Sequence, residues 1–91
     1  MRSSADLDSR RKRILYRAWH RGTKEMDLVL GAYADARIAM LDDAGLDQLE
    51  HLMTVTDPNA YKWLSGARPV PPEWDSPLVR DIRTFHAAGD A

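Results

Sequence analysis

Residues 13–27 read RILYRAWHRGTKEMD, and this stretch decides where the chain first reverses direction. Gly22 divides the stretch, because glycine tolerates the left-handed backbone conformation that commonly ends a helix. The expected helices on either side cover residues 8–21 and 23–38. The reversal is expected to place Arg21 beside Glu25, as a partly exposed ion pair on a stiff corner. Substituting either residue is then expected to change stability by about 1 kcal/mol or less.

Apolar residues continue at helical spacing beyond this corner, and start signals divide them into three more helices. Asp42, Asp57 and Ser76 are the expected N-caps of these helices, and Gly66 is the expected end of the middle one. Pro58 is expected at the first helical position of that middle helix. The three prolines within residues 67–74 predict an extended linker. The expected helical ranges are 43–55, 58–65 and 77–86.

Together these elements predict an all-α protein, a small five-helix bundle that forms a single domain over residues 1–91. Neighbouring helices joined by short connections are expected to pack roughly antiparallel. The ordered core is expected over residues 9–86, with frayed termini. The candidate N-caps of the first helix are Asp6, Asp8 and Ser9. The side chains expected in the core are Leu30, Leu46, Leu49, Leu52, Leu64, Ile82 and Phe85.

Length and composition argue against several classes of protein. A chain of 91 residues has little room for a deep active-site pocket, which favours surface recognition over catalysis. The chain has no cysteine, and its three histidines stand at no metal-ligand spacing, so neither a disulfide framework nor a zinc site is expected. No apolar run approaches the roughly 20 residues of a membrane span. The N-terminus lacks the apolar core of a signal peptide, so we expect a bacterial cytoplasmic protein.

The net charge of −1 conceals an asymmetry between the two parts of the chain. Residues 1–24 hold eight Lys/Arg and two Asp, a balance of +6, whereas residues 25–91 hold five Lys/Arg and twelve Asp/Glu, a balance of −7. The first helix concentrates its arginines at helical spacing. This basic stripe predicts a polar partner surface or an anionic ligand. The arginines expected along it are Arg10, Arg13, Arg17 and Arg21.

Two alternative functions follow from these charges. The basic first helix is compatible with nucleic-acid binding, although the chain is slightly acidic overall and no helix carries side chains in a base-reading arrangement. A small enzyme would use His20 with Glu25 or Asp27, but no nucleophile or metal-ligand set accompanies them.

Two blocks of sequence carry a resemblance to a known family. The first is the Arg21-Gly22-x-x-Glu25 core, with Arg13-x-x-Tyr16 before it and Asp27 after it. The second is Leu49-Glu50 followed by Asp57 and Trp63-Leu64-Ser65-Gly66. With these blocks, residues 9–86 resemble the succinate dehydrogenase FAD assembly factor family, which has bacterial and mitochondrial members.

The resemblance implies a function and a site. Family members bind the flavoprotein subunit of succinate dehydrogenase and promote covalent attachment of FAD to it, without being catalysts themselves and without stably binding a cofactor of their own. A fumarate reductase flavoprotein is an equally allowed client, whereas nucleic acid and direct membrane insertion are not implied. Some members have also been labelled antitoxins, which keeps an antitoxin-type regulatory protein as an alternative. The implied partner-binding residues are Arg21, Gly22, Glu25, Arg13, Tyr16, His20 and Asp27.

The sequence departs from the family pattern at two positions. His20 stands where many members carry Arg or Lys, which makes the charge of the implied site depend on pH. Gly45 stands where the family often has Glu, which removes a capping-box partner for Asp42 and is expected to weaken the start of the third helix.

Overall fold

The structure, a computed structural model, describes residues 7–89 and contains helices and turns but no β-strand within that range. This architecture confirms the expected all-α, five-helix fold. The α-helices are α1 (Ser9–Trp19), α2 (Lys24–Arg37), α3 (Asp43–Leu52), α4 (Asp57–Leu64) and α5 (Pro77–Gly89), and the short 3₁₀ helices are η2 (Ile38–Met40) and η3 (Pro72–Trp74).

Side-chain caps explain where several helices begin. The carboxylate of Asp8 accepts a hydrogen bond from the backbone N–H of Arg11, and that of Asp42 accepts one from Gly45 at 2.8 Å. Each cap satisfies a backbone donor that the first helical turn leaves without a partner. Ser76 caps α5 in the same way, as expected. The candidate cap Asp6 lies outside the described residues.

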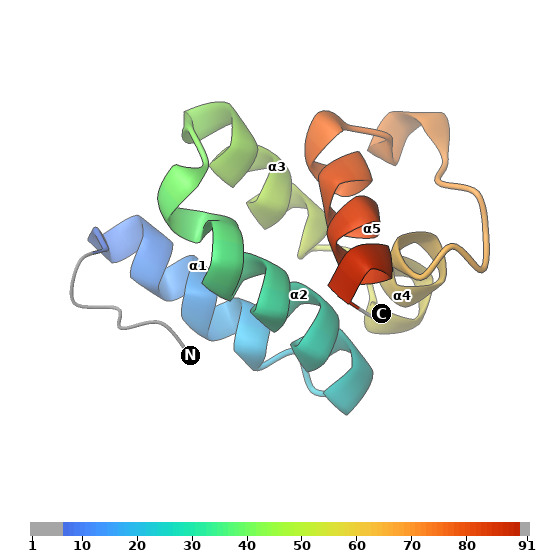
Figure 1. Ribbon diagram of the computed structural model, residues 1–91, viewed down its shortest axis with the longest axis horizontal. Coiled ribbons are helices and arrows are strands. Elements are labelled where there is room, and N and C mark those ends of the chain that lie inside the picture. The colour runs from blue at the N-terminus through green and yellow to red at the C-terminus, as the bar shows by residue number, and fades with distance from the viewer. Residues whose placement is uncertain (1–6, 90–91) are drawn as a thin grey trace.

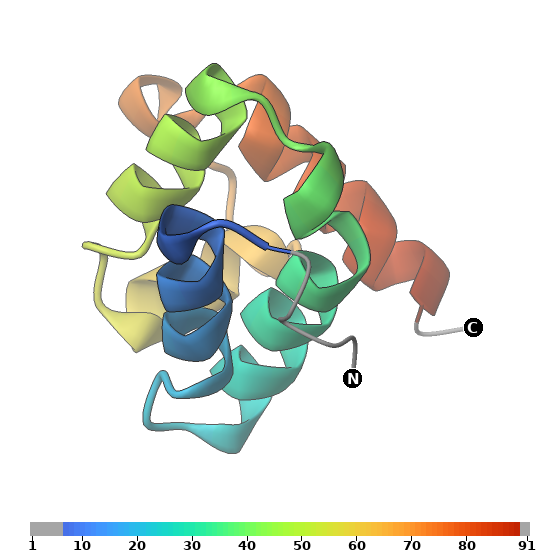
Figure 2. The same ribbon diagram turned by 90° about the vertical axis from the view of Figure 1, so that its left-hand side faces the viewer.

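The helices pack as a hairpin joined to a second layer. Helices α1 and α2 run antiparallel and side by side, while α5 lies across the other face of α2 and also packs against α3 and α4 (Figures 1 and 2). This arrangement brings the turn between α1 and α2 towards α4. Within residues 7–89, no helix combines the length and the apolar composition that a membrane span requires.

The core lies between these layers. Of the side chains expected there, Phe85 is only half-buried, and its ring meets the buried ring of Tyr33 edge-on at 5.6 Å. The guanidinium carbon of Arg37 lies 5.5 Å from the centre of the same Phe85 ring and covers it from outside. The expected core residues that are fully buried are Leu30, Leu46, Leu49, Leu52, Leu64 and Ile82.

The structure corrects two expected helix ends. Helix α1 ends at Trp19, not at residue 21, and α3 ends at Leu52, not at residue 55. After α3 the backbone tightens into 3₁₀-type turns, in which Thr54 donates to the carbonyl of His51 and Val55 to that of Leu52. Because the helices end early, backbone carbonyls near these ends lack an intrahelical donor and can accept hydrogen bonds from side chains of other elements.

The second half of the chain differs from expectation in three places. Thr56, not Asp57, is the N-cap of α4 and makes no side-chain cap bond, so Pro58 occupies the second helical position. The stretch expected to be an extended linker contains η3. Helix α5 continues to Gly89, so residues 87–89, expected to be frayed, are helical. At the other end, Leu7 is buried and Asp8 caps α1, although both were expected to be frayed. The remaining expected frayed ends, residues 1–6 and 90–91, lie outside the described residues.

Candidate functional site

The corner between α1 and α2 has a backbone that requires glycine at one position. Helix α1 is capped by His20, whose N–H donates to the carbonyl of Arg17 at 3.2 Å. Gly22 then adopts a φ of 107°, a value that side-chain-bearing residues rarely adopt, and Thr23 caps the start of α2. The expected positive φ at Gly22 is confirmed. Gly22 follows the helix end by three residues, however, and so is not the residue that terminates α1.

Arg21 is bonded into the body of the protein. Its Nη2 lies 2.7 Å from Oδ1 of Asp57, and its Nε donates to the same oxygen at 3.0 Å. Its Nη1 and Nη2 also donate to the carbonyls of Met53 and Val55, at 2.7 and 3.0 Å. The Arg21 and Asp57 side chains are only 12% and 13% exposed. Arg21 therefore ties the α1–α2 corner to the end of α3 and the start of α4.

Asp27 braces the same corner from within α2. Its Oδ1 accepts a hydrogen bond from the backbone N–H of Arg21 at 2.6 Å. The bond gives a backbone donor in the turn its partner. Asp27 also lies in the first turn of α2, where the helix dipole favours negative charge. Asp27 thus holds the backbone that presents Arg21 to Asp57.

The expected ion pair between Arg21 and Glu25 does not form. Arg21 turns towards Asp57 because Met53 and Val55 offer carbonyl oxygens beside that carboxylate, so that every nitrogen of the guanidinium has a partner. Glu25 is exposed and makes no hydrogen bond or ion pair with any residue in the described range 7–89. The expectation that both residues contribute little to stability is therefore retained for Glu25 alone.

Tyr16 and His20 form an aromatic pair on the surface of the corner. Their rings stack with centroids 4.0 Å apart and planes 18° apart, and Tyr16 is 65% exposed. Nδ1 of His20 lies 2.6 Å from the carbonyl oxygen of Tyr16. A carbonyl can only accept, so Nδ1 carries the proton and donates. The imidazole is thereby held against the phenol ring while its Nε2 edge has no partner among the described residues.

The expected arginine stripe is divided between two roles. Arg10 bonds Asp47 and Glu50 of α3, which together raise its pKa, and Arg21 is bonded as described above. Arg13 and Arg17 remain exposed and make no ion pair with any described residue. Much of the stripe therefore joins helices within the protein, which weakens the alternative of a phosphate-binding first helix.

Two features of the corner were not anticipated from the sequence. The partner of Arg21, Asp57, was interpreted only as a helix cap, because an acid before a proline is a common helix start. The second is Gly31, which lies within a helical pattern, where glycine often marks close packing. A Cβ atom built at Gly31 would clash with the Trp19 ring, so the indole packs directly on the α2 backbone.

The seven expected site residues thus fall into three groups. Arg21 and Asp27 stabilise the corner from inside, and Gly22 shapes its backbone. Tyr16 and His20 form the stacked surface pair. Glu25 and Arg13 lie exposed on the first turn of α2 and on α1, respectively. Among the described residues, no group of three His, Cys, Asp or Glu side chains is arranged to hold a metal ion.

Comparison with known proteins gives one consistent match. The family described as the flavinator of succinate dehydrogenase matches residues 12–86. The FAD assembly factor SdhE of Acetobacter pasteurianus is 35% identical over 75 residues, covering 82% of this chain and 69% of that protein. The mitochondrial succinate dehydrogenase assembly factor 2 of Mycosarcoma maydis is 32% identical over 88 residues, covering 97% of this chain. That of Arabidopsis thaliana is 38% identical over 61 residues, covering 67% of it.

The chain spans about a third of the length of these two mitochondrial relatives, 34% and 32%. No solved structure was found to match it.

Proposed function

The chain belongs to the family described as the flavinator of succinate dehydrogenase, and from this membership we propose that it is an assembly factor for a flavoprotein. Its client is the flavoprotein subunit of succinate dehydrogenase, and its effect is to promote covalent attachment of FAD to that subunit. The observation that carries the proposal is the family match over residues 12–86, which includes the whole corner, most of α1 and all of α2.

The corner supplies a contact surface for such a client. Glu25, Arg13 and the Tyr16–His20 pair are exposed on the turn and the helix ends around it. Asp27 bonds the backbone N–H of Arg21 in this turn, and Asp57 bonds the Arg21 side chain. A surface that is already rigid loses little conformational entropy on binding, so few contacts suffice for a specific complex. In this proposal Glu25 meets a basic group of the client, while Tyr16 contributes the aromatic area typical of interface centres.

The proposal assigns Arg21 a different role from the residues around it. Its guanidinium is engaged by Asp57 and two carbonyls, so it positions the contact surface and does not itself contact the client. Gly22 is required because the turn that presents Glu25 needs its positive φ. The Arg21-Gly22-x-x-Glu25 core is thus divided between one internal residue, Arg21, and one external residue, Glu25.

The chemistry of flavin attachment is assigned to the client and its bound FAD. The assembly factor is proposed to act without catalytic residues and without holding FAD stably, in the bacterial cytoplasm where the client is made. The shaped, charged corner stabilises a client form that is competent for the reaction.

Co-production with the client tests this function. The flavoprotein subunit is produced in cells that lack the native gene for this chain, with and without the chain supplied in trans. We expect the two proteins to co-purify and in-gel flavin fluorescence of the denatured subunit to appear only when the chain is present. Equal fluorescence in both samples would contradict the proposal. A fumarate reductase flavoprotein tested in parallel reports whether the client range extends to it.

A further inference from the structure

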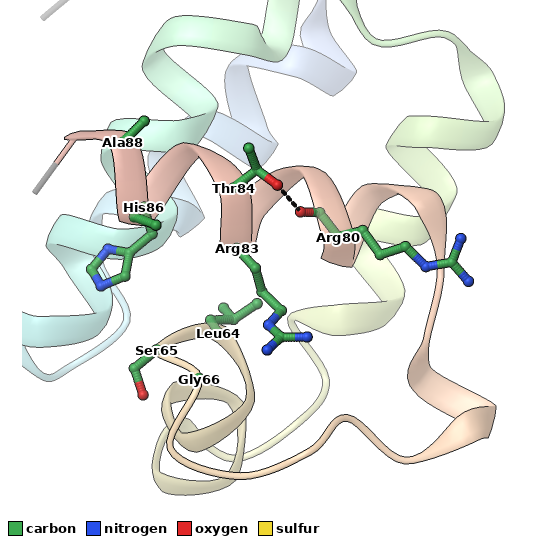
Figure 3. A pocket seen from close by; sticks show the side chains of 9 residues that line it. Leu64, Ser65, Gly66, Arg80, Arg83, Thr84, His86 and Ala88 are labelled. Atoms are coloured by element: carbon green, nitrogen blue, oxygen red, sulfur yellow. Dashed lines mark hydrogen bonds between the residues drawn. The ribbon is translucent and has the colours of Figure 1, made fainter.

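A groove runs along the opposite end of α4 from the corner. It is lined by the end of α4 and the turn after it, Leu64 to Gly66, and by α5, and it encloses about 920 Å³ (Figure 3). A smaller lobe of about 400 Å³ continues past Gly66 and Arg83 along the proline-rich stretch. Gly66 and Arg83 line both lobes, so the lobes adjoin at these residues, and together they are called the groove.

The groove is positively charged, whereas the part of the chain that forms it is acidic overall. Residues 25–91 carry a balance of −7 and contain only five Lys or Arg residues. Arg68, Arg80 and Arg83, three of those five, line this one groove, and Asp75 is the acid among its lining residues. An otherwise acidic surface therefore presents a local region of positive potential, which attracts anionic groups.

The arginines of the groove differ in their availability. Arg80 donates to both carboxylate oxygens of Asp75, at 2.9 and 3.3 Å, and this pairing, with a smaller influence from Arg83, lowers the pKa of Asp75. The guanidinium groups of Arg83 and Arg68 make no hydrogen bond or ion pair with any residue from 7 to 89. Within that range no group occupies their donors, which suit an external carboxylate.

The lining favours an extended chain over a small molecule. Leu64 is buried and forms the floor, whereas Gly66, Arg83 and Thr84 are exposed. Arg83 and His86 project from the same side of α5 towards the end of α4 (Figure 3). Small-molecule sites bury most of their ligand among apolar walls. The exposed walls of this groove would leave a small ligand open to solvent. An open groove with cations spaced along it matches a peptide segment.

We propose that this groove binds an acidic segment of the flavoprotein client, with its carboxylates paired to Arg83 and Arg68. The inference rests on the proposed function and extends it with a second contact surface. The corner bonds to α4 through Asp57 at its first residue, and the groove begins at Leu64, its last. Asp57 and Leu64 are separated by a rise of about 10 Å, so the bond that fixes the corner and the start of the groove lie at opposite ends of one short helix.

Matched charge reversals test the proposal. Arg83→Glu and Lys62→Glu change the net charge equally, but Lys62 is an exposed residue of α4 outside the groove lining. We expect Arg83→Glu to weaken binding to the purified flavoprotein subunit about tenfold or more, and Lys62→Glu to change it less than about twofold. The affinity of the wild-type chain should decrease as the salt concentration rises from about 50 to about 300 mM, and Arg83→Glu should make this decrease smaller. Arg83→Lys, which keeps the charge, should bind more tightly than Arg83→Glu.

The location is tested separately with a hexaglutamate peptide. Titration of the isotopically labelled chain should shift the amide resonances of Ser65, Gly66 and Arg83. Shifts caused by inorganic phosphate but not by the peptide would overturn the proposal in favour of a phosphate site. If the wild-type chain binds the client and Arg83→Glu binds equally well, the groove inference fails while the proposed function stands. If the wild-type chain does not bind the client, both fail.

Discussion

Nη2 of Arg21 lies 2.7 Å from Oδ1 of Asp57, which joins the corner of the first helical hairpin to the first residue of α4. Arg21 also bonds the carbonyls of Met53 and Val55 just beyond the end of α3. One side chain therefore connects three separate segments. Loss of activity after its substitution would not by itself identify it as a contact residue, because the contact surface depends on it.

The first prediction concerns the stability that Arg21 contributes. Arg21→Ala should destabilise the protein by about 2–4 kcal/mol, because it leaves the mostly buried Asp57 carboxylate and two carbonyls without their charged donor. Arg21→Lys should recover only part of this loss, since an ammonium cannot reproduce the planar fork. Urea unfolding measures both, with the exposed Arg17→Ala as a control that should cost about 0.5 kcal/mol or less. A small effect for Arg21→Ala would mean that the bonds to Asp57 contribute little in solution.

The second prediction separates function from stability at Glu25. Glu25→Gln should change stability by less than about 1 kcal/mol, because the side chain is exposed and has no partner in the described part of the chain. Covalent FAD on the client should nevertheless fall strongly, as expected for a central contact. Flavin fluorescence and melting temperature are measured on the same preparations. Glu73→Gln, another exposed acid, is the matched control and should retain full activity. Normal flavinylation with Glu25→Gln would remove this residue from the contact surface.

The third prediction concerns the backbone at Gly22. A Cβ atom built there meets nothing within 4 Å, so any cost of substitution comes from the φ of 107° and not from crowding. Gly22→Ala should therefore destabilise by about 1–2 kcal/mol, and Gly22→Val by more because β-branched residues tolerate this region least. Chemical denaturation measures the cost, and far-ultraviolet circular dichroism should show that the helices remain. Equal stability of Gly22→Ala and the wild-type protein would mean that the turn relaxes to an ordinary conformation.

The fourth prediction concerns pH. Burial, followed by the 2.7 Å hydrogen bond to Asp81, raises the pKa of Tyr33 above its ordinary value. The stabilisation from the protonated phenol is thus fully present below the unfolded value of about 10 and is lost as the pH rises through the folded value. Tyr33→Phe should cost about 1–2 kcal/mol at neutral pH and flatten the fall in stability above about pH 10. Urea unfolding at both pH values checks this, and an unchanged alkaline slope in Tyr33→Phe would contradict it.

Local signals were sufficient for most of the helices and for the buried face of each. Asp42, Ser76 and Gly66 mark helix ends through bonds and dihedral angles that involve only nearby residues, and the structure has them in those roles. The apolar spacing likewise identified the buried leucines, because a helix fixes which residues share a face. The local signals did not place the end of α3, where Arg21, a residue distant in sequence, donates hydrogen bonds to the carbonyls of Met53 and Val55.

Within the site, the sequence by itself determined the position of the turn and the exposure of Glu25. Only the tertiary structure decided the partner of Arg21. Glu25 is four residues away and Asp57 is 36, and a sequence pattern ranks the nearer acid first. The guanidinium instead bonds where a carboxylate and two free carbonyls converge, and that convergence exists only once α4 has packed beside the hairpin. Helical periodicity is local, whereas the choice between hydrogen-bond partners depends on which groups the completed fold brings within about 3 Å.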